Sequence, residues 1–284
     1  LSRDTVMQAY NELKTHGIIS SKKGKGYYIE STDTHREEKI FLLFDELNSF
    51  KEDLYNAFLD GLDSNAYVDV FFHHYNYQVF KNQILESAGK YTSYVIMPAS
   101  FDNFGHLIQK LSGNRVYFLD RLKTELNGYP VVYQDFESDV FESLVKVKNL
   151  LEKYRRLVFV QPGGKEPQER VSGFRRFCQE FRFEHKVIRS LNEITPSLYD
   201  AFMVPSDRTL VELVRLAQDY EYEIWTKFGI ISFNDSLFKQ LVAGGITTIS
   251  TDFVSMGHTL SEMVLQKKMH QIRNKSDIIV RKTL

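Results

Sequence analysis

Short apolar runs alternate with amphipathic segments along most of the chain. The run at 228–233 is almost continuously apolar, which favours a strand buried on both faces of a parallel sheet. Strand-like runs lie at 39–44, 68–73, 94–97, 116–119, 157–160, 201–204 and 228–233, and helical patterns in the first half lie at 50–62, 77–88 and 101–111. Strands that alternate with helices form βαβ units. Because this alternation restarts in the second half, the sequence predicts an α/β fold with two lobes, parallel sheets and a cleft between the lobes.

The run at 228–233 ends abruptly in two polar residues, Asn234 and Asp235. Ligands of open α/β sheets gather beyond the carboxyl ends of the strands, so this position is a candidate ligand contact. A plain turn or a helix N-cap is the alternative, because Asn and Asp are common in both. A second strand is predicted at 246–249, followed by a helix that opens at 252–253.

The first 29 residues follow another pattern. Apolar residues at helical spacing predict a helix that starts near Ser2 and ends at Gly17. Two short predicted strands, at 18–21 and 26–29, flank the basic turn Lys-Lys-Gly-Lys at 22–25. A helix followed by a basic hairpin can place one element in a DNA groove and another against phosphate. The alternative is a solvated basic hairpin beside an amphipathic helix.

Charge is distributed unevenly along the chain. Residues 1–29 hold five basic and two acidic residues, a net charge of +3, so the remainder carries −4 of the total of −1. The segment at 30–38, ESTDTHREE, has no large apolar residue and is typical of a solvated linker between domains. The sequence therefore predicts a basic amino-terminal domain joined by a linker to a larger domain at 39–284.

The overall composition is that of an ordinary soluble globular protein, with 43% hydrophobic and 26% charged residues among 284. No run approaches the roughly 18 apolar residues of a membrane span, and no signal-like segment opens the chain. The one cysteine, Cys178, cannot form an internal disulfide, which agrees with a reducing compartment. We therefore expect a cytoplasmic protein without a membrane partner.

Enzyme signatures are weak in this sequence. Gly163, Gly164 and Lys165 lack the frame of a phosphate-binding P-loop, and neither a dinucleotide-binding glycine motif nor a nucleophile elbow is present. His73 and His74 are adjacent in a predicted strand, so their side chains are expected on opposite faces, which argues against a shared metal. We therefore expect no catalytic residues, no metal and no cofactor.

The amino-terminal residues resemble a known DNA-binding family. The matching residues are Ser2-Arg3-Asp4-Thr5-Val6, Ala9-Tyr10, Leu13, Gly17-Ile18 and Lys25-Gly26. This order resembles the recognition helix and wing of GntR-type winged helix-turn-helix proteins. The resemblance implies that Ser2, Arg3 and Thr5 contact DNA from the recognition helix, and that Lys23, Gly24 and Lys25 do so from the wing. Since the family's first two helices do not precede this segment, residues 1–29 are expected to be a partial winged helix-turn-helix domain.

The remainder, 39–284, resembles the effector domain of LacI-type bacterial regulators. The matching segments are Phe118-Leu119-Asp120-Arg121, Pro130-Val131-Val132 with Asp135, Glu169-Arg170 with Gly173-Phe174, Pro205-Ser206-Asp207, Asn234-Asp235, Ile246-Thr247-Thr248-Ile249, Asp252-Phe253, Met256-Gly257 and Ile278-Ile279-Val280-Arg281. The resemblance implies a two-lobed periplasmic-binding-protein-like fold. Lobe 1 would comprise about 39–136 and 251–273, and lobe 2 about 137–250 and 274–284.

The same resemblance implies a ligand site in the cleft between the lobes. Its implied residues are Asn48, Phe50, Asp120, Arg170, Ser206, Asn234 and Phe253. A neutral sugar suits such a site, because a polyol needs fixed donors and acceptors together with a flat apolar wall. Alternatives remain for individual residues: Arg170 could pair with Glu169 or another acid, and Phe50 and Phe253 could be ordinary core residues. Asn234 replaces the family's aspartate, and an amide can donate as well as accept a hydrogen bond.

Together the two resemblances imply a sugar-responsive transcriptional regulator of a carbohydrate-utilisation operon, similar to arabinose-repressor-like regulators. A monosaccharide in the cleft would modulate the binding of operator DNA by a homodimer, through a shift between lobe orientations. One alternative is a cytoplasmic protein that binds a sugar, a purine or an amino acid without regulating DNA. An α/β enzyme is a third possibility, which a bound metal or nucleotide would favour.

Overall fold

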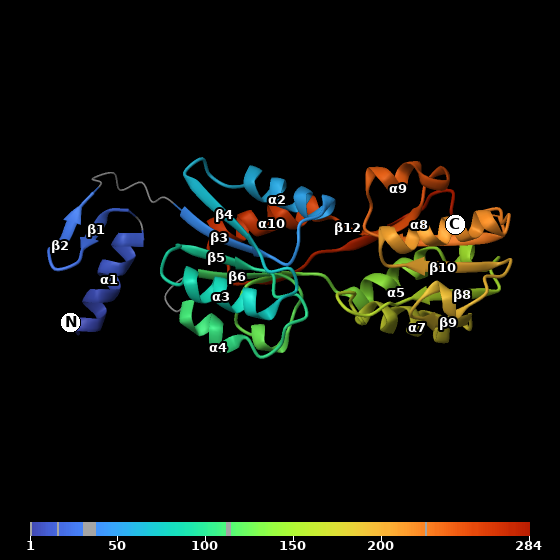
Figure 1. The fold of residues 1–284 in the computed structure, drawn as a ribbon, viewed down its shortest axis with the longest axis horizontal. Coiled ribbons are helices and arrows are strands. Elements are labelled where there is room, and N and C mark those ends of the chain that lie inside the picture. Colours follow the sequence, from blue (N-terminus) through green and yellow to red (C-terminus); the bar gives the residue numbers. More distant parts are fainter. Residues whose placement is uncertain (1, 16, 31–37, 112–114, 225) are drawn as a thin grey trace. The chain divides into compact units, whose positions relative to one another are not determined.

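The computed structural model describes residues 2–15, 17–30, 38–111, 115–224 and 226–284. The chain divides into two compact units, shown with the rest of the fold in Figure 1. Unit 1 comprises Leu1–Tyr133 and Val254–Ile272, and unit 2 comprises Gln134–Phe253 and Arg273–Leu284. The chain therefore passes from one unit to the other three times, after residues 133, 253 and 272, where the sequence-based lobes change after 136, 250 and 273.

The amino-terminal segment forms a helix and a hairpin, as the pattern predicts. Helix α1 (Arg3–Thr15) precedes strands β1 (Ile19–Lys22) and β2 (Gly26–Ile29), which pair antiparallel. The turn between the strands uses Gly24 and Gly26 at φ of +76° and +99°, a region that favours glycine. Of the linker expected at 30–38, residues 31–37 lie outside the described residues, and Glu38 already belongs to the next strand.

A six-stranded sheet forms the centre of the rest of unit 1. Its strand order is β13-β7-β6-β5-β3-β4, and the neighbours among β3, β4, β5, β6 and β7 pair in parallel. The strands are β3 (Glu38–Phe44), β4 (Ala66–Phe72), β5 (Ser93–Ile96), β6 (Arg115–Asp120), β7 (Val131–Tyr133) and β13 (Gln271–Arg273). The helices are α2 (Ser49–Asp60), α3 (Tyr77–Ser87), α4 (Gly105–Ile108) and α10 (Phe253–Leu265), with short 3-10 turns at Gln109–Leu111 and Thr124–Leu126. Residues 40–44 of β3 are fully buried or nearly so, because helices cover both faces of the sheet.

Unit 2 repeats this architecture around a second six-stranded sheet, of order β14-β12-β11-β10-β8-β9. Its strands are β8 (Arg156–Val160), β9 (Glu184–Ile188), β10 (Asp200–Val204), β11 (Phe228–Phe233), β12 (Thr247–Thr251) and β14 (Ser276–Ile279), and only β14 pairs antiparallel to its neighbour. The helices are α5 (Phe136–Lys146), α6 (Lys148–Leu151), α7 (Glu169–Phe181), α8 (Asp207–Asp219) and α9 (Leu237–Leu241), with 3-10 turns at Leu191–Glu193 and Val242–Gly244. All six residues of β11 are buried, which confirms the central strand predicted at 228–233.

Two sequence-based predictions of secondary structure are wrong. The helix expected at 101–111 starts only at Gly105, because Glu125 accepts hydrogen bonds from the backbone N–H of Asn103 and Phe104 and holds the preceding residues in a loop. The strand expected to contain His73 and His74 ends at Phe72. His74 adopts a left-handed conformation, with φ of 48°, so strand alternation cannot decide where these two rings point.

Among the described residues, no helix is long and apolar enough to cross a membrane.

The glycines of two matched motifs have a packing role instead of a chemical one. A Cβ atom at Gly173 of α7 would lie 2.2 Å from the carbonyl oxygen of Glu137 on α5. A Cβ atom at Gly257 of α10 would lie 2.4 Å from the carbonyl oxygen of Leu54 on α2. These positions therefore allow two pairs of helices to approach closely.

We expect Gly257→Ala to lower the free energy of unfolding by about 1–3 kcal/mol, the usual cost of overpacking, because backbone of α2 must move to admit the new methyl group. Gly105→Ala is the matched control, since its Cβ would meet nothing closer than 4.0 Å. Urea denaturation followed by circular dichroism measures both variants. Equal stabilities of the two would contradict the close packing of α2 and α10.

Candidate functional site

The polar turn after β11 is fixed by a buried lysine. Asn234 adopts a left-handed conformation, with φ of 58°, and its N–H donates to the Ile249 carbonyl at 2.9 Å. Lys239 of α9 is only 3% exposed, and its ammonium donates to the carbonyl oxygens of Phe233 and Asn234 at 2.6 and 2.7 Å. It also lies 2.9 Å from an Asp207 carboxylate oxygen. Three acceptors around one ammonium thus hold the carboxyl end of β11 in place.

Burial lowers the pKa of Lys239 from its ordinary value, and the hydrogen bond and charge of Asp207 oppose that shift. Sequence reasoning did not single this lysine out, because a lone lysine in a short helix is normally solvated. Its burial follows from the fold, which places it under the turn.

Asp235 is engaged within the protein. The guanidinium of Arg281 donates two hydrogen bonds to its carboxylate, at 2.6 and 2.7 Å, and the hydroxyl of Thr248 donates another at 3.2 Å. Burial tends to raise the pKa of Asp235, but the hydrogen bonds and charge of Arg281 outweigh it, so the pKa is lowered. This carboxylate therefore ties the end of β11 to the carboxyl-terminal segment.

Arg170 and Asn234 line the same small cavity in unit 2, together with Gln134, Phe136, Phe233 and Thr251 among others. Arg170 is 7% exposed, and its guanidinium lies over the ring of Phe233, 4.2 Å from the centroid. The cavity holds about 10 Å³, roughly the space of one water molecule. An acid that pairs with Arg170 is Glu166, at 3.4 Å.

Gln161 is a polar residue that the sequence reasoning missed. It directly follows β8 and is 6% exposed. Its amide nitrogen donates to the Glu166 carbonyl at 3.2 Å, whereas its side-chain oxygen has no hydrogen-bond partner among the described residues. A buried acceptor without a donor is costly, so Gln161 is a further candidate for contact with a ligand or a bound water. The sequence did contain a signal for Gln161, because this polar residue directly follows the apolar strand β8.

Four further candidates lie at the starts of helices α2, α8 and α10. The Ser206 hydroxyl caps α8 by accepting a hydrogen bond from the Thr209 N–H at 3.3 Å. Asn48 caps α2 by accepting from the Lys51 N–H at 3.1 Å. Phe253 is 8% exposed, as expected for a core residue, while Phe50 is half-buried. Asn and Ser are both residue types that are favoured at this capping position.

Unit 1 has its own polar cluster beyond β3, built around Asp45. Asp45 is 4% exposed and forms an ion pair with Lys51 of α2, which is 6% exposed. The hydroxyl of Tyr75 donates to the other oxygen of Asp45 at 2.9 Å. None of these three residues was singled out from the sequence. Asp45 nevertheless follows an apolar strand directly, and a polar residue in that position is the signal that identified Asn234.

Asp120 belongs to the same region of unit 1. Burial raises the pKa of Tyr75 first, and the negative charges of Asp45, Glu46 and Asp120 raise it further, so the phenol stays protonated and remains a donor. Asp120 has a left-handed backbone, with φ of 79°, at the carboxyl end of β6. The structure thus brings one predicted ligand residue of unit 1 close to a donor and acceptor cluster that the sequence did not reveal.

His73 lies beside this cluster, fully buried, with its Nε2 atom 3.0 Å from the Met97 carbonyl oxygen. Burial lowers the pKa of the imidazole, which favours the neutral ring. His74 is exposed. No group of three or more potential metal ligands occurs among the residues that the structure describes.

The candidate DNA contacts are exposed. Ser2, Arg3 and Thr5 lie at the start of α1, where the Ser2 hydroxyl accepts a hydrogen bond from the Thr5 N–H at 3.2 Å. Lys23, Gly24 and Lys25 lie in the turn between β1 and β2. The rings of Tyr10 and Tyr27 stack with centroids 4.4 Å apart, which packs the hairpin against the helix. The basic side chains in the turn are exposed to solvent.

Comparison with known proteins identifies the fold. A family model described as a periplasmic binding protein-like domain matches residues 150–284. No curated protein matches the chain. The structure of the lac repressor dimer bound to operator and the anti-inducer ONPF is 16% identical, with a TM-score of 0.72, over 88% of this chain and 82% of that chain. A LacI family transcriptional regulator from Silicibacter pomeroyi is 15% identical, with a TM-score of 0.72, over 87% and 98% of the two chains.

A transcription regulator like protein from Staphylococcus haemolyticus is also similar, at 15% identity and a TM-score of 0.70, over 87% of this chain and 98% of that chain. The larger part of this chain therefore has the periplasmic-binding-protein-like α/β fold found in LacI-type effector domains. The predicted α/β fold class is confirmed, whereas the amino-terminal winged helix-turn-helix stays a prediction. At these identities the likeness concerns the fold alone.

We expect Lys239→Met to lower the free energy of unfolding by about 3 kcal/mol, because two backbone carbonyls and Asp207 lose their shared buried donor. The control is Lys275→Met, which alters an exposed lysine of the same unit and should change stability by less than about 0.5 kcal/mol. Guanidinium denaturation of both variants measures the difference. A Lys239→Met protein as stable as the control would show that the ammonium does not hold the turn.

The ion pair of Asp235 should give a defined pH dependence. Its pKa is lowered in the folded protein, so its stabilisation is present above the ordinary value of 3.8 and is lost as the pH falls through the lower folded value. We expect Asp235→Asn to be less stable than the wild type by about 2 kcal/mol at neutral pH, with a smaller difference in acid. Asp219→Asn, an exposed control in α8, should show no such trend in thermal unfolding at several pH values. A pH-independent difference for Asp235→Asn would contradict the lowered pKa.

Proposed function

We propose that this chain is a ligand-responsive transcription regulator that binds operator DNA through its amino-terminal helix and hairpin. The observation that carries the proposal is the joining, in one chain, of an exposed basic hairpin to a periplasmic-binding-protein-like domain. Several proteins with the same fold are described as transcription regulators, and one structure holds both an operator and an anti-inducer. A regulator of this kind acts in the cytoplasm, and no catalytic step is part of the proposal.

The DNA-binding part is proposed to be a GntR-type winged helix. Arg3, Lys23 and Lys25 are exposed and form no ion pair among the described residues, so they are free to neutralise phosphates. Ser2 and Thr5 lie at the amino-terminal end of α1, where backbone N–H groups and the helix dipole also favour phosphate. Residues at this end of a recognition helix are those that reach base edges in helix-turn-helix proteins.

The effector is proposed to be a monosaccharide that contacts polar groups at the carboxyl ends of the strands in unit 2. Arg170 and Asn234 supply donors and acceptors there, at the same small cavity. The Arg170 guanidinium lies over the rings of Phe136 and Phe233, and this stacking holds its donors in position. Because the cavity beside Arg170 has room for about one water molecule, only the edge of a sugar could enter it without movement of side chains.

Coupling between effector and operator is proposed to follow from a population shift in a homodimer. An effector that binds one conformation more tightly favours that conformation, and the dimer converts the change into a different spacing of two DNA-binding heads. The coupling must be reciprocal, so operator DNA weakens effector binding by the same factor by which effector weakens operator binding. A pure small-ligand binding protein would lack this reciprocity.

The proposal is tested by fluorescence anisotropy of labelled operator DNA with the complete protein, titrated against a panel of monosaccharides. We expect one sugar to shift operator affinity by about five- to 150-fold, the usual range of allosteric coupling. Arg170→Ala should abolish the response to sugar but leave operator affinity in its absence unchanged, because Arg170 lies in unit 2 and α1 lies in unit 1. Lys23→Ala should weaken operator binding and reduce its salt dependence.

Arg175→Ala serves as the matched control, since Arg175 is an exposed arginine of the same helix α7. Binding of a sugar without any change in operator affinity would favour the small-ligand binding protein. A normal sugar response in Arg170→Ala would remove Arg170 from the site, and failure of every sugar would contradict a carbohydrate effector.

A further inference from the structure

A second pocket lies in unit 1, away from the carboxyl ends of the strands. It has a volume of about 400 Å³ and is formed where β3, β4 and β6 begin and where α10 ends. The strands of this sheet run parallel, so the pocket is at the edge opposite the candidate effector residues of unit 1. Its size falls within the range of small-molecule sites. The proposed function does not use it.

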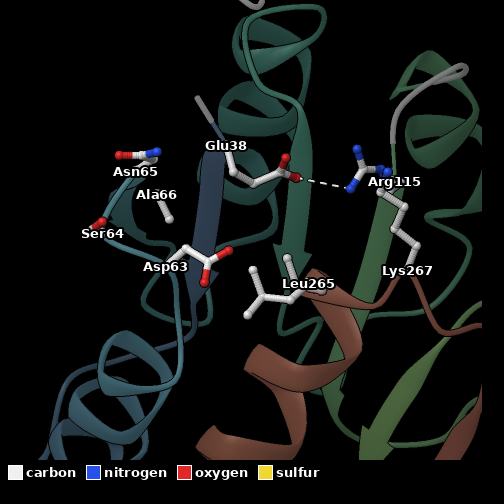
Figure 2. Close-up of a pocket in the computed structure, with 9 residues that line it drawn as sticks. Glu38, Asp63, Ser64, Asn65, Ala66, Arg115, Leu265 and Lys267 are labelled. Atoms are coloured by element: carbon white, nitrogen blue, oxygen red, sulfur yellow. Dashed lines mark hydrogen bonds and ion pairs between the residues drawn. The ribbon is translucent and has the colours of Figure 1, made fainter. Parts of the chain in front are cut away.

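Charges of opposite sign face each other across this pocket. Figure 2 shows Arg115 and Lys267 on one side and Asp63, with Ser64 and Asn65, on the other. Asp63 and Lys267 form neither an ion pair nor a side-chain hydrogen bond among the described residues. The pocket therefore presents a positive side and a negative side, neither fully neutralised from within the protein.

Glu38 joins the two sides. Its carboxylate lies 3.2 Å from Arg115 and accepts a hydrogen bond from the Ser93 hydroxyl at 2.6 Å. Both of these contacts use the same Glu38 oxygen, and a guanidinium has five N–H donors, so Arg115 can still donate to a ligand carboxylate. The Glu38 and Arg115 side chains are 18% and 28% exposed, so this ion pair in the pocket wall is partly shielded from solvent.

The lining restricts the chemistry of the ligand. The apolar part of the wall comes from Ala66, Val264 and Leu265, and no aromatic side chain is among the described residues that line the pocket, so it lacks the flat surface that suits a sugar or a purine. Two carboxylates disfavour a phosphate or any other polyanion. A small molecule with one carboxylate and one ammonium matches both sides at once.

We propose that this pocket binds a free amino acid. Its carboxylate would be held by Arg115 and Lys267, its ammonium by Asp63 and Glu38, and a small side chain would rest on Ala66 and Leu265. Charge-assisted hydrogen bonds to both ends would select a zwitterion over molecules with only one of the two charges.

Glu38, which would hold the ligand's ammonium, is the first residue of β3. The pocket therefore lies at the starts of strands and shares no lining residue with the cavity beside Arg170.

The test is isothermal titration calorimetry of the complete protein with each of the twenty standard amino acids. We expect at least one of them to bind, and its amide and its N-acetyl derivative, which each lack one charge, to fail to bind. Asp63→Asn and Lys267→Gln should each weaken binding by about tenfold, the effect of losing one charge-assisted hydrogen bond. Both residues are exposed, so these variants should fold normally.

Asp60→Asn and Lys110→Gln are the matched controls, because both alter exposed residues of unit 1 that do not line the pocket. Arg170→Ala separates the two proposals, since it should leave amino acid binding intact while abolishing the sugar response. The inference is overturned if no amino acid binds, or if binding survives both Asp63→Asn and Lys267→Gln. Binding lost only in Arg170→Ala would place the amino acid at the other site and would also overturn it.

Discussion

A buried ammonium group fixes the polar edge of each sheet, and the candidate site depends on it. Lys51 of α2 does this in unit 1, where it pairs with Asp45 after β3. Lys239 of α9 does it in unit 2, where it holds the carbonyl oxygens at the end of β11. Both lysines are 6% exposed or less, and a lysine is buried to this extent only when its partners compensate for the lost hydration. The positions of both ammonium groups are therefore fixed by their hydrogen-bond and ion-pair partners. Polar residues beyond the strands are thereby kept in a defined conformation, which binding a small polar ligand requires.

The alternation of apolar runs and helical patterns was sufficient to predict the fold class. Strands such as β3 and β11 are buried along nearly their whole length, and a short continuous apolar run is typical of a strand that helices cover on both faces. The edge strand β9 was missed because Glu184 and Lys186 are exposed, so its sequence does not read as a core strand. Strand β13, of three residues, is too short to give any pattern.

The candidate site was harder to predict than the fold. Sequence identifies polar residues that follow apolar strands, and it found Asn234 in this way. It cannot show which polar groups already form hydrogen bonds within the protein. The carboxylate of Asp235 is bonded to Arg281, which lies 46 residues away along the chain. Nor could it distinguish Lys51 and Lys239 from solvated lysines. The resemblance suggested Arg170, and the structure adds that this guanidinium is buried against Phe233.

The proposed effector site in unit 2 is made of polar groups beyond the strands, with Arg170 and Asn234 at one small cavity. Hydrogen–deuterium exchange of the complete protein, with and without the monosaccharide that binds it, measures whether this site is occupied. Bound sugar should slow exchange at the backbone amides of 161–170 and 234–236. Unchanged exchange at both segments would mean that the sugar does not bind there.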